Sequence, residues 1–190
     1  MKKNTRNIIR FAALVLALAT CVLSMTGCIY KLIFGGSSVA KLFGDKVTLK
    51  DGGSVGHLTC AVPEGLEADE DDSTRKRYEL ENGDGGRFYV RLEKHSVLLS
   101  FTDMQNDAGS IEEDEDNKDI KTESAKFNGT KWAMIRYSRY DSDLGGDVEM
   151  TVYYGTYDRM GVREWYKIVF YNTAENRSFV DAFMKKTKIS

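Results

Sequence analysis

Hydrophobic and polar positions alternate through most of the second half of the chain, and this pattern predicts β-strands. The alternating segments are residues 120–127, 130–140, 148–154 and 165–171. Asn128-Gly129 separates the first two segments and favours a two-residue hairpin turn. Short turn signals separate the others. Four consecutive strands joined in this way predict an antiparallel meander.

The first half alternates in shorter pieces. We expect strands at residues 46–50, 57–62, 77–81, 87–93 and 97–101, with the last of these the most apolar and therefore central. Residues 64–72 are strongly acidic and predict a solvated loop, and His95 falls in a turn signal and is expected to be exposed. Residues 103–119 lack an apolar pattern and predict a long loop with one helical turn near residues 104–108. The acidic run at 112–119 has no role that the sequence reveals.

The chain closes with a predicted amphipathic helix. Phe179, Val180, Phe183 and Met184 fall on one helical stripe, and Asn172 or Thr173 is the expected cap. The predicted fold class is therefore α+β, an antiparallel sheet packed by a C-terminal helix on one face. A second helical layer stays open as an alternative.

The first 28 residues have the layout of an export signal. Four basic residues precede an apolar run from Phe11 to Val22, and small residues then lead to Cys28. The ending Met25-Thr26-Gly27-Cys28 resembles a bacterial lipoprotein signal, and the resemblance implies cleavage before Cys28 and attachment of lipid to its sulfur. We therefore expect a signal peptide at 1–27, an anchor and flexible spacer at 28–45, and one globular domain at 46–190.

A second interpretation of the N-terminus stays open. Residues 11–34 span 24 positions with Lys31 as the one charged residue, which is long enough for an uncleaved transmembrane helix. The basic residues before this stretch keep the N-terminus inside in both cases, so the globular part is exported. The alternatives are an anchored lipoprotein and a signal-anchored sensor domain.

Charge and cysteine content narrow the classes of partner. Removing residues 1–27 leaves 163 residues with a net charge of −6, because all 29 acidic but only 23 of the 27 basic residues lie beyond the signal. An acidic domain of this size argues against nucleic acid as a partner. Cys60 is the one cysteine beyond Cys28 after cleavage, so an internal disulfide is not expected within the domain.

Several segments together resemble the Mog1/PsbP-like fold. They are the sequence Ala-Val-Pro-Glu-Gly-Leu at 61–66, Lys-Phe-Asn-Gly at 126–129, Trp-Tyr-Lys-Ile-Val-Phe at 165–170 and a terminal helix with Phe179 and Phe183. The resemblance runs from about residue 55 to the end. It implies an antiparallel sheet flanked by helices and a role in binding or assembly, and it brings no catalytic residues.

Reactive motifs are weak throughout. His57 and Cys60 lie three positions apart in a predicted strand and point to opposite faces, so Cys60 is expected in the core. Two histidines and one thiol do not support a zinc site. The acidic segments lack the EF-hand pattern, so no cofactor is expected, and weak Ca²⁺ binding there stays open. The glycine clusters lack the spacing of a phosphate-binding loop.

Aromatic residues exceed what one face of a sheet needs. They either pack a second layer or form an exposed surface that binds a partner. The candidate surface consists of Trp132, Tyr140, Tyr153 and Tyr171.

The sequence thus favours a membrane-anchored extracytoplasmic module that binds or assembles an envelope protein or small ligand without catalysis. The alternative activity is that of a hydrolase whose acidic residues meet from distant loops.

Overall fold

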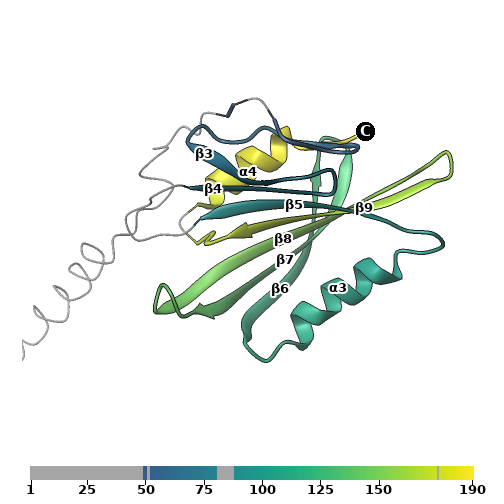
Figure 1. The fold of residues 1–190 in the computed structure, drawn as a ribbon. Coiled ribbons are helices and arrows are strands. Elements are labelled where there is room, and N and C mark those ends of the chain that lie inside the picture. The colour runs from purple at the N-terminus through teal and green to yellow at the C-terminus, as the bar shows by residue number, and fades with distance from the viewer. Residues whose placement is uncertain (1–48, 51, 81–87, 175) are drawn as a thin grey trace, which may run out of the picture. The chain divides into compact units, whose positions relative to one another are not determined.

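A computed structural model describes residues 49–50, 52–80, 88–174 and 176–190, all within one compact unit. Its main sheet has seven strands in the order β3-β4-β5-β9-β8-β7-β6, and all neighbouring strands are antiparallel (Figure 1). The predicted α+β class is confirmed, and so is the meander, which comprises β6 to β9.

The strands of the main sheet are β3 (Leu66–Asp71), β4 (Arg75–Leu80), β5 (Tyr89–Ser96), β6 (Asn117–Phe127), β7 (Thr130–Asp141), β8 (Gly146–Arg159) and β9 (Val162–Tyr171). A small second sheet joins β1 (Ser54–Val55), β2 (Leu58–Thr59) and β10 (Lys188–Ile189). The helices are α3 (Thr102–Glu113) and α4 (Arg177–Lys186).

Helix α4 covers one face of the sheet. Its predicted stripe is confirmed, because Phe179, Val180, Phe183 and Met184 are all buried there. The Phe183 ring packs edge-on against Phe170 of β9 with centroids 5.2 Å apart. Because side chains alternate along a strand, residues two apart join this core, which includes Val90 and Leu92 of β5, Tyr153 of β8, and Tyr166, Ile168 and Phe170 of β9.

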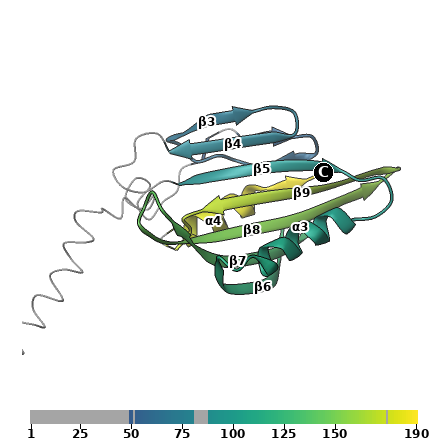
Figure 2. The same ribbon diagram turned by 60° about the horizontal axis from the view of Figure 1, so that its bottom comes forward.

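Helix α3 supplies a second layer on the opposite face, beside the part of the sheet formed by β6, β7 and β8 (Figure 2). Ile111 is buried against this face, and Phe101, Met104 and Ala108 pack around it. The expectation of a long loop at 103–119 is therefore wrong. These four residues are spaced 3, 4 and 3 apart, which is a helical stripe that the acidic flanks conceal.

Two further expectations in the first half are wrong for related reasons. Strand β5 runs on to Ser96, so the predicted turn at 94–95 does not exist and His95 is half-buried. Residues 97–101 form a connection instead of a central strand, and Leu98 and Leu99 in it are 95% and 85% exposed. An apolar run alone does not distinguish a buried strand from a loop.

The acidic segment at 64–72 is also not a loop. Residues 66–71 form the edge strand β3, and its carboxylates form ion pairs with basic side chains of β4. Asp69 lies 3.4 Å from the guanidinium of Arg77, and Asp71 pairs with Lys76. Charged side chains on an edge strand discourage pairing with another molecule.

Smaller differences concern element ends. The strand predicted at 57–62 is reduced to β2, and Leu49 makes an isolated bridge with Pro63. Helix α4 begins after Asn176 instead of Asn172 or Thr173, and no side-chain hydrogen bond caps it.

The signal, Cys28, residues 11–34, the spacer and the hairpin signal at 82–86 lie outside the described residues. Within the part of the chain that is described, neither helix is long and apolar enough to cross a membrane.

Candidate functional site

The predicted aromatic surface does not form. Trp132, Tyr153 and Tyr171 are buried, at 0%, 2% and 7% exposed, and only Tyr140 of the four is open, at 58%. Tyr153 packs under α4, where burial raises its pKa to about 12, and Tyr171 stacks on Tyr89 on the opposite face. The hypothesis of an exposed aromatic patch is therefore wrong for these three residues, because they are buried in the cores on the two faces of the sheet.

Cys60 is a core residue, as expected. Its thiol donates to the carbonyl of Gly53 over 3.7 Å, and burial raises the pKa of the thiol to about 12. It therefore stays protonated and cannot act as a thiolate nucleophile. His57 stacks on Tyr157 with ring centroids 4.5 Å apart.

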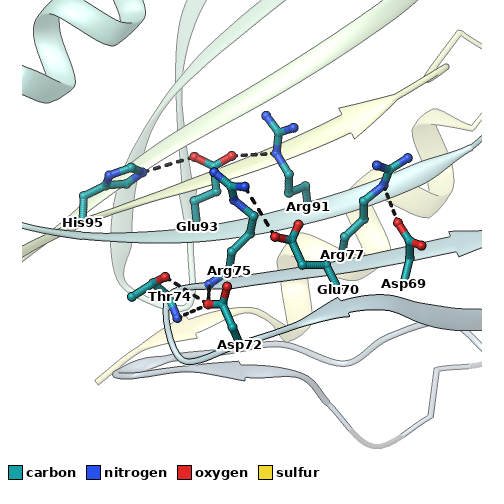
Figure 3. A network of polar contacts seen from close by, with 9 residues as sticks. All are labelled: Asp69, Glu70, Asp72, Thr74, Arg75, Arg77, Arg91, Glu93 and His95. Atoms are coloured by element: carbon teal, nitrogen blue, oxygen red, sulfur yellow. Dashed lines mark hydrogen bonds and ion pairs between the residues drawn. The ribbon is translucent and has the colours of Figure 1, made fainter.

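Polar side chains instead gather on the half of the α3-side face that is formed by β3, β4 and β5, where neither view shows α3 above them (Figures 1 and 2). Val90 and Leu92 of β5 point to the α4 core, so Arg91, Glu93 and His95 share the other face. On the adjacent strand, Arg77 pairs with Arg91 in register and Arg75 pairs with Glu93. Their side chains project to the same side (Figure 3).

Glu93 is the centre of this group. One carboxylate oxygen lies 2.6 Å from Nε of Arg91, and the other lies 3.2 Å from Nε2 of His95. The residue is only 8% exposed, so this arrangement holds a carboxylate in place between two nitrogen-bearing side chains. Figure 3 shows the three side chains in a row along β5.

The His95 ring is fixed from the other side by Trp165 of β9. Their centroids are 3.8 Å apart and their planes are within 7° of parallel. The indole N–H of Trp165 is buried and has no hydrogen-bond partner among the described residues. The imidazole is thus held between a carboxylate and an aromatic ring while 39% of its side chain stays open to solvent.

These residues form one wall of a pocket of about 500 Å³. We call it the β5 pocket, and it is lined by Asp72, Thr74, Arg75, Glu93, Lys94, His95, Ser96, Asp103 and Trp165. It is polar, with three carboxylates and three basic side chains. Sequence reasoning missed it because its residues come from β5, the β3–β4 turn, the start of β4, α3 and β9.

The β3–β4 turn is held by Asp72. Its side chain accepts hydrogen bonds of 2.6 Å from the backbone N–H of both Thr74 and Arg75. These bonds lower the pKa of Asp72 below its ordinary value. Arg75, in turn, lies 3.4 Å from Glu70. The turn therefore presents a fixed carboxylate and a guanidinium to the pocket.

Helix α3 is fixed beside the pocket by a contact to the sheet. Asp107 accepts a hydrogen bond of 2.7 Å from the Tyr154 hydroxyl, and Nζ of Lys167 lies 2.7 Å from the same carboxylate oxygen. Burial and then the bond to Asp107 raise the pKa of Tyr154. This contact sets the position of Asp103, one helical turn earlier, in the pocket wall.

Acid–base chemistry finds little support in this geometry. A carboxylate that orients an imidazole is one half of a nucleophile-activating unit. However, within the described residues the hydrogen bond of the His95 ring goes to Glu93, and none joins the ring to a hydroxyl or thiol. The lowered pKa of Asp72 is the reverse of what a general acid needs. Among the described residues, the pocket thus holds the carboxylate and imidazole of such a unit without a bonded nucleophile.

Metal binding has no built site in the described part of the chain. No group of three or more His, Cys, Asp or Glu side chains there is placed to hold an ion. In the acidic run, Asp114 and Asp116 lie 3.3 and 3.6 Å from the guanidinium of Arg139, and Glu112 accepts a hydrogen bond from Thr122. Arg139 thus neutralises part of the charge that Ca²⁺ would require.

The comparisons with known proteins bear on the fold. No protein-family model and no curated protein sequence matches the chain. One similar solved structure is LpqN, involved in cell envelope biogenesis of Mycobacterium tuberculosis, with a TM-score of 0.51 and 13% identity over 80% of this chain and 96% of that one. Another is a protein from Bacteroides thetaiotaomicron, with a TM-score of 0.50 and 9% identity over 75% of this chain. The match spans 49%, about half, of the Bacteroides protein. At these identities the similarity shows a shared fold.

Proposed function

We propose that this protein is a cell-envelope lipoprotein, anchored to the outer face of the bacterial cytoplasmic membrane through Cys28, whose domain binds a polar ligand of the envelope without catalysis. The order of basic, apolar and small residues before Cys28 supports the anchor. The seven-stranded sheet with a helix on each face agrees with the Mog1/PsbP-like resemblance. The envelope role of LpqN, which has a similar fold, is compatible with this proposal.

The observation that carries the binding role is the buried carboxylate of Glu93 at the wall of the β5 pocket. A buried charge is costly unless neighbours compensate it, and here Arg91 and His95 do so. Such an arrangement fixes the side chains before a ligand arrives, which lowers the entropic cost of binding. Few apolar residues line the pocket, so the ligand must bring its own donors and acceptors.

The charges in the pocket define the ligand class further. Arg75 offers donors, Asp72 and Asp103 offer acceptors, and the ring nitrogen of His95 that does not face Glu93 adds a further polar contact. A ligand with both hydroxyl or amide donors and carboxylate or carbonyl acceptors matches this mixture. A purely anionic or purely cationic ligand would meet like charge on part of the wall.

The anchor is tested by the intact mass of the protein extracted from membranes. The proposal predicts a chain that begins at Cys28 and carries a diacylglyceryl group. Cys28→Ala should block processing and leave the full-length chain. An unprocessed wild-type chain, with residues 11–34 retained, would support the signal-anchored alternative.

The binding role is tested by photo-crosslinking in cells. A benzoyl-phenylalanine is placed at Ser96, which is exposed in the pocket lining, and at Ser142, which is exposed in the β7–β8 turn. The proposal predicts an adduct at position 96 that is absent at 142 and is lost when Arg75 and His95 are both changed to Ala. Recovery of the bare protein from both positions would contradict it.

A further inference from the structure

Exposed large apolar side chains concentrate in two connections of the described chain. Leu98 and Leu99, in the β5–α3 connection, are 95% and 85% exposed. Met160 and Val162, in the β8–β9 hairpin, are fully and 41% exposed. The remaining exposed large hydrophobic residue in this part of the chain is Tyr140. We call Leu98, Leu99, Met160 and Val162 the apolar tip.

The two connections are joined to each other. The backbone N–H of Val97 donates to the carbonyl of Arg163 over 3.0 Å, and the Arg163 guanidinium donates to the carbonyl of Leu99. Arg163 is itself held by Asp158, 3.1 Å away. Figures 1 and 2 both show the hairpin and the β5–α3 connection extending from the same end of the sheet. Hydrogen bonds therefore hold the backbones of the two connections together, while the apolar side chains of the tip are exposed to solvent.

The tip differs in charge from the β7–β8 connection, which carries Asp141 and Asp143. The β8–β9 hairpin carries Arg159 and Arg163 against Asp158 alone. A locally basic, apolar protrusion on an acidic domain suits a surface with a negative potential and an apolar interior.

We propose that the apolar tip inserts into the interface of the bilayer that carries the anchor, an inference that rests on the proposed lipidation of Cys28. A protruding pair of connections fits a deformable lipid surface, whereas a protein partner would need a matching cavity. The 20 residues between Cys28 and Leu49 can span at most roughly 70 Å, more than the diameter of about 37 Å of a domain this size.

The anchor also lowers the affinity that the tip needs. Because the domain is held near the membrane, a weak second contact forms at high effective concentration. One lipid attachment and one apolar loop contact together constitute two membrane signals. Ser96 and Asp103 flank the β5–α3 connection and line the β5 pocket, so insertion of the tip would bring the pocket close to the headgroups.

The test uses the full, lipidated chain in vesicles of phosphatidylethanolamine and phosphatidylglycerol. A nitrobenzoxadiazole probe is attached at Met160→Cys or, as a control, at Ser142→Cys in the β7–β8 turn. Cys60 is buried with a raised pKa and should not react. We expect a blue-shifted emission that doxyl-labelled lipid quenches at position 160, and solvent-like emission at 142. The shift at 160 should be lost when Leu98 and Leu99 are both changed to Asp.

The possible outcomes distinguish failure of the tip proposal from failure of the proposed lipid anchor. A lipidated chain that floats with the vesicles but shows the same solvent-like emission at 160 and 142 overturns the tip proposal and leaves the anchor intact. A blue shift at 160 that appears only in native membranes, with no quenching by doxyl lipid in the vesicles, overturns it in favour of a protein partner. A chain that carries no lipid and does not float contradicts both proposals.

Discussion

His95 and Trp165 stack with ring centroids 3.8 Å apart, although 70 residues separate them in sequence. The antiparallel register of β5 and β9 places them directly opposite each other. On its edge, His95 meets Glu93, so the imidazole is held in position without being enclosed. This arrangement makes His95 the most informative residue of the β5 pocket.

Changing His95 to Ala should therefore separate binding from stability. Loss of the stack should lower the free energy of unfolding by about 1 kcal/mol, as measured by urea denaturation. The crosslink at position 96 should weaken strongly. His57→Ala is the matched control, because His57 stacks on Tyr157 away from the pocket and its loss should leave the crosslink unchanged. Equal crosslinking in the His95→Ala and His57→Ala variants would contradict a role of His95 in binding.

Asp107→Asn should loosen α3. The amide keeps the shape of the carboxylate but loses the charge that pairs with Lys167. We therefore expect the free energy of unfolding to fall by about 1–3 kcal/mol. Hydrogen exchange should accelerate at the amides of residues 102–113 more than in the sheet. Glu113→Gln, an exposed change at the end of the same helix, should leave exchange unaltered. If both variants exchange alike, the Asp107–Lys167 contact does not hold the helix.

Glu149 should make stability depend on acid pH. Burial acts to raise its pKa, but hydrogen bonds from Arg177 and Thr173 outweigh this and hold the pKa below the usual 4.5. A carboxyl with a lowered pKa in the folded state stabilises the protein above its unfolded pKa, and the contribution is lost as pH falls through the folded value. Glu149→Gln should thus unfold more easily than wild type at pH 7, and the gap should narrow below about pH 4. A gap that is constant with pH would contradict the assignment.

Gly155 should not tolerate a side chain. A Cβ there would lie 2.7 Å from Cζ3 of Trp132 and 2.8 Å from Cδ1 of Ile189. Trp132 is fully buried and cannot move freely, so Gly155→Ala should cost about 1–3 kcal/mol in thermal or urea unfolding. Gly146→Ala in the same strand meets no atom within 4 Å and serves as the control. Equal stability of the two variants would show that the β8 core has room at Gly155.

The strands and the terminal helix were predictable because their apolar residues recur with one clear period. Phe179, Val180, Phe183 and Met184 show the helical period, and the Asn128-Gly129 turn sets the register of β6 and β7. Helix α3 was predictable in principle from Phe101, Met104, Ala108 and Ile111, but its charged positions lower the mean hydropathy and hide the stripe. Strand β3 was hidden similarly, because an edge strand needs few apolar residues.

The candidate site was not predictable in the same way. The alternation of Arg91, Glu93 and His95 with Val90 and Leu92 is visible in the sequence and indicates a polar face. That Trp165 faces His95 depends on the pairing of β5 with β9, which skips three intervening strands. Long-range strand pairing of this kind leaves no local signal.

The most direct test of the binding role is the reactivity of the two histidines toward diethyl pyrocarbonate. The full chain, with a tag that contains no histidine, is labelled in native membranes and again after purification into pure-lipid vesicles. A bilayer is present in both preparations, but only the native membranes contain envelope ligands. We predict that His95 reacts more slowly in native membranes than in pure-lipid vesicles, while His57 reacts equally in both. Equal reactivity of His95 in the two preparations would contradict an occupied β5 pocket.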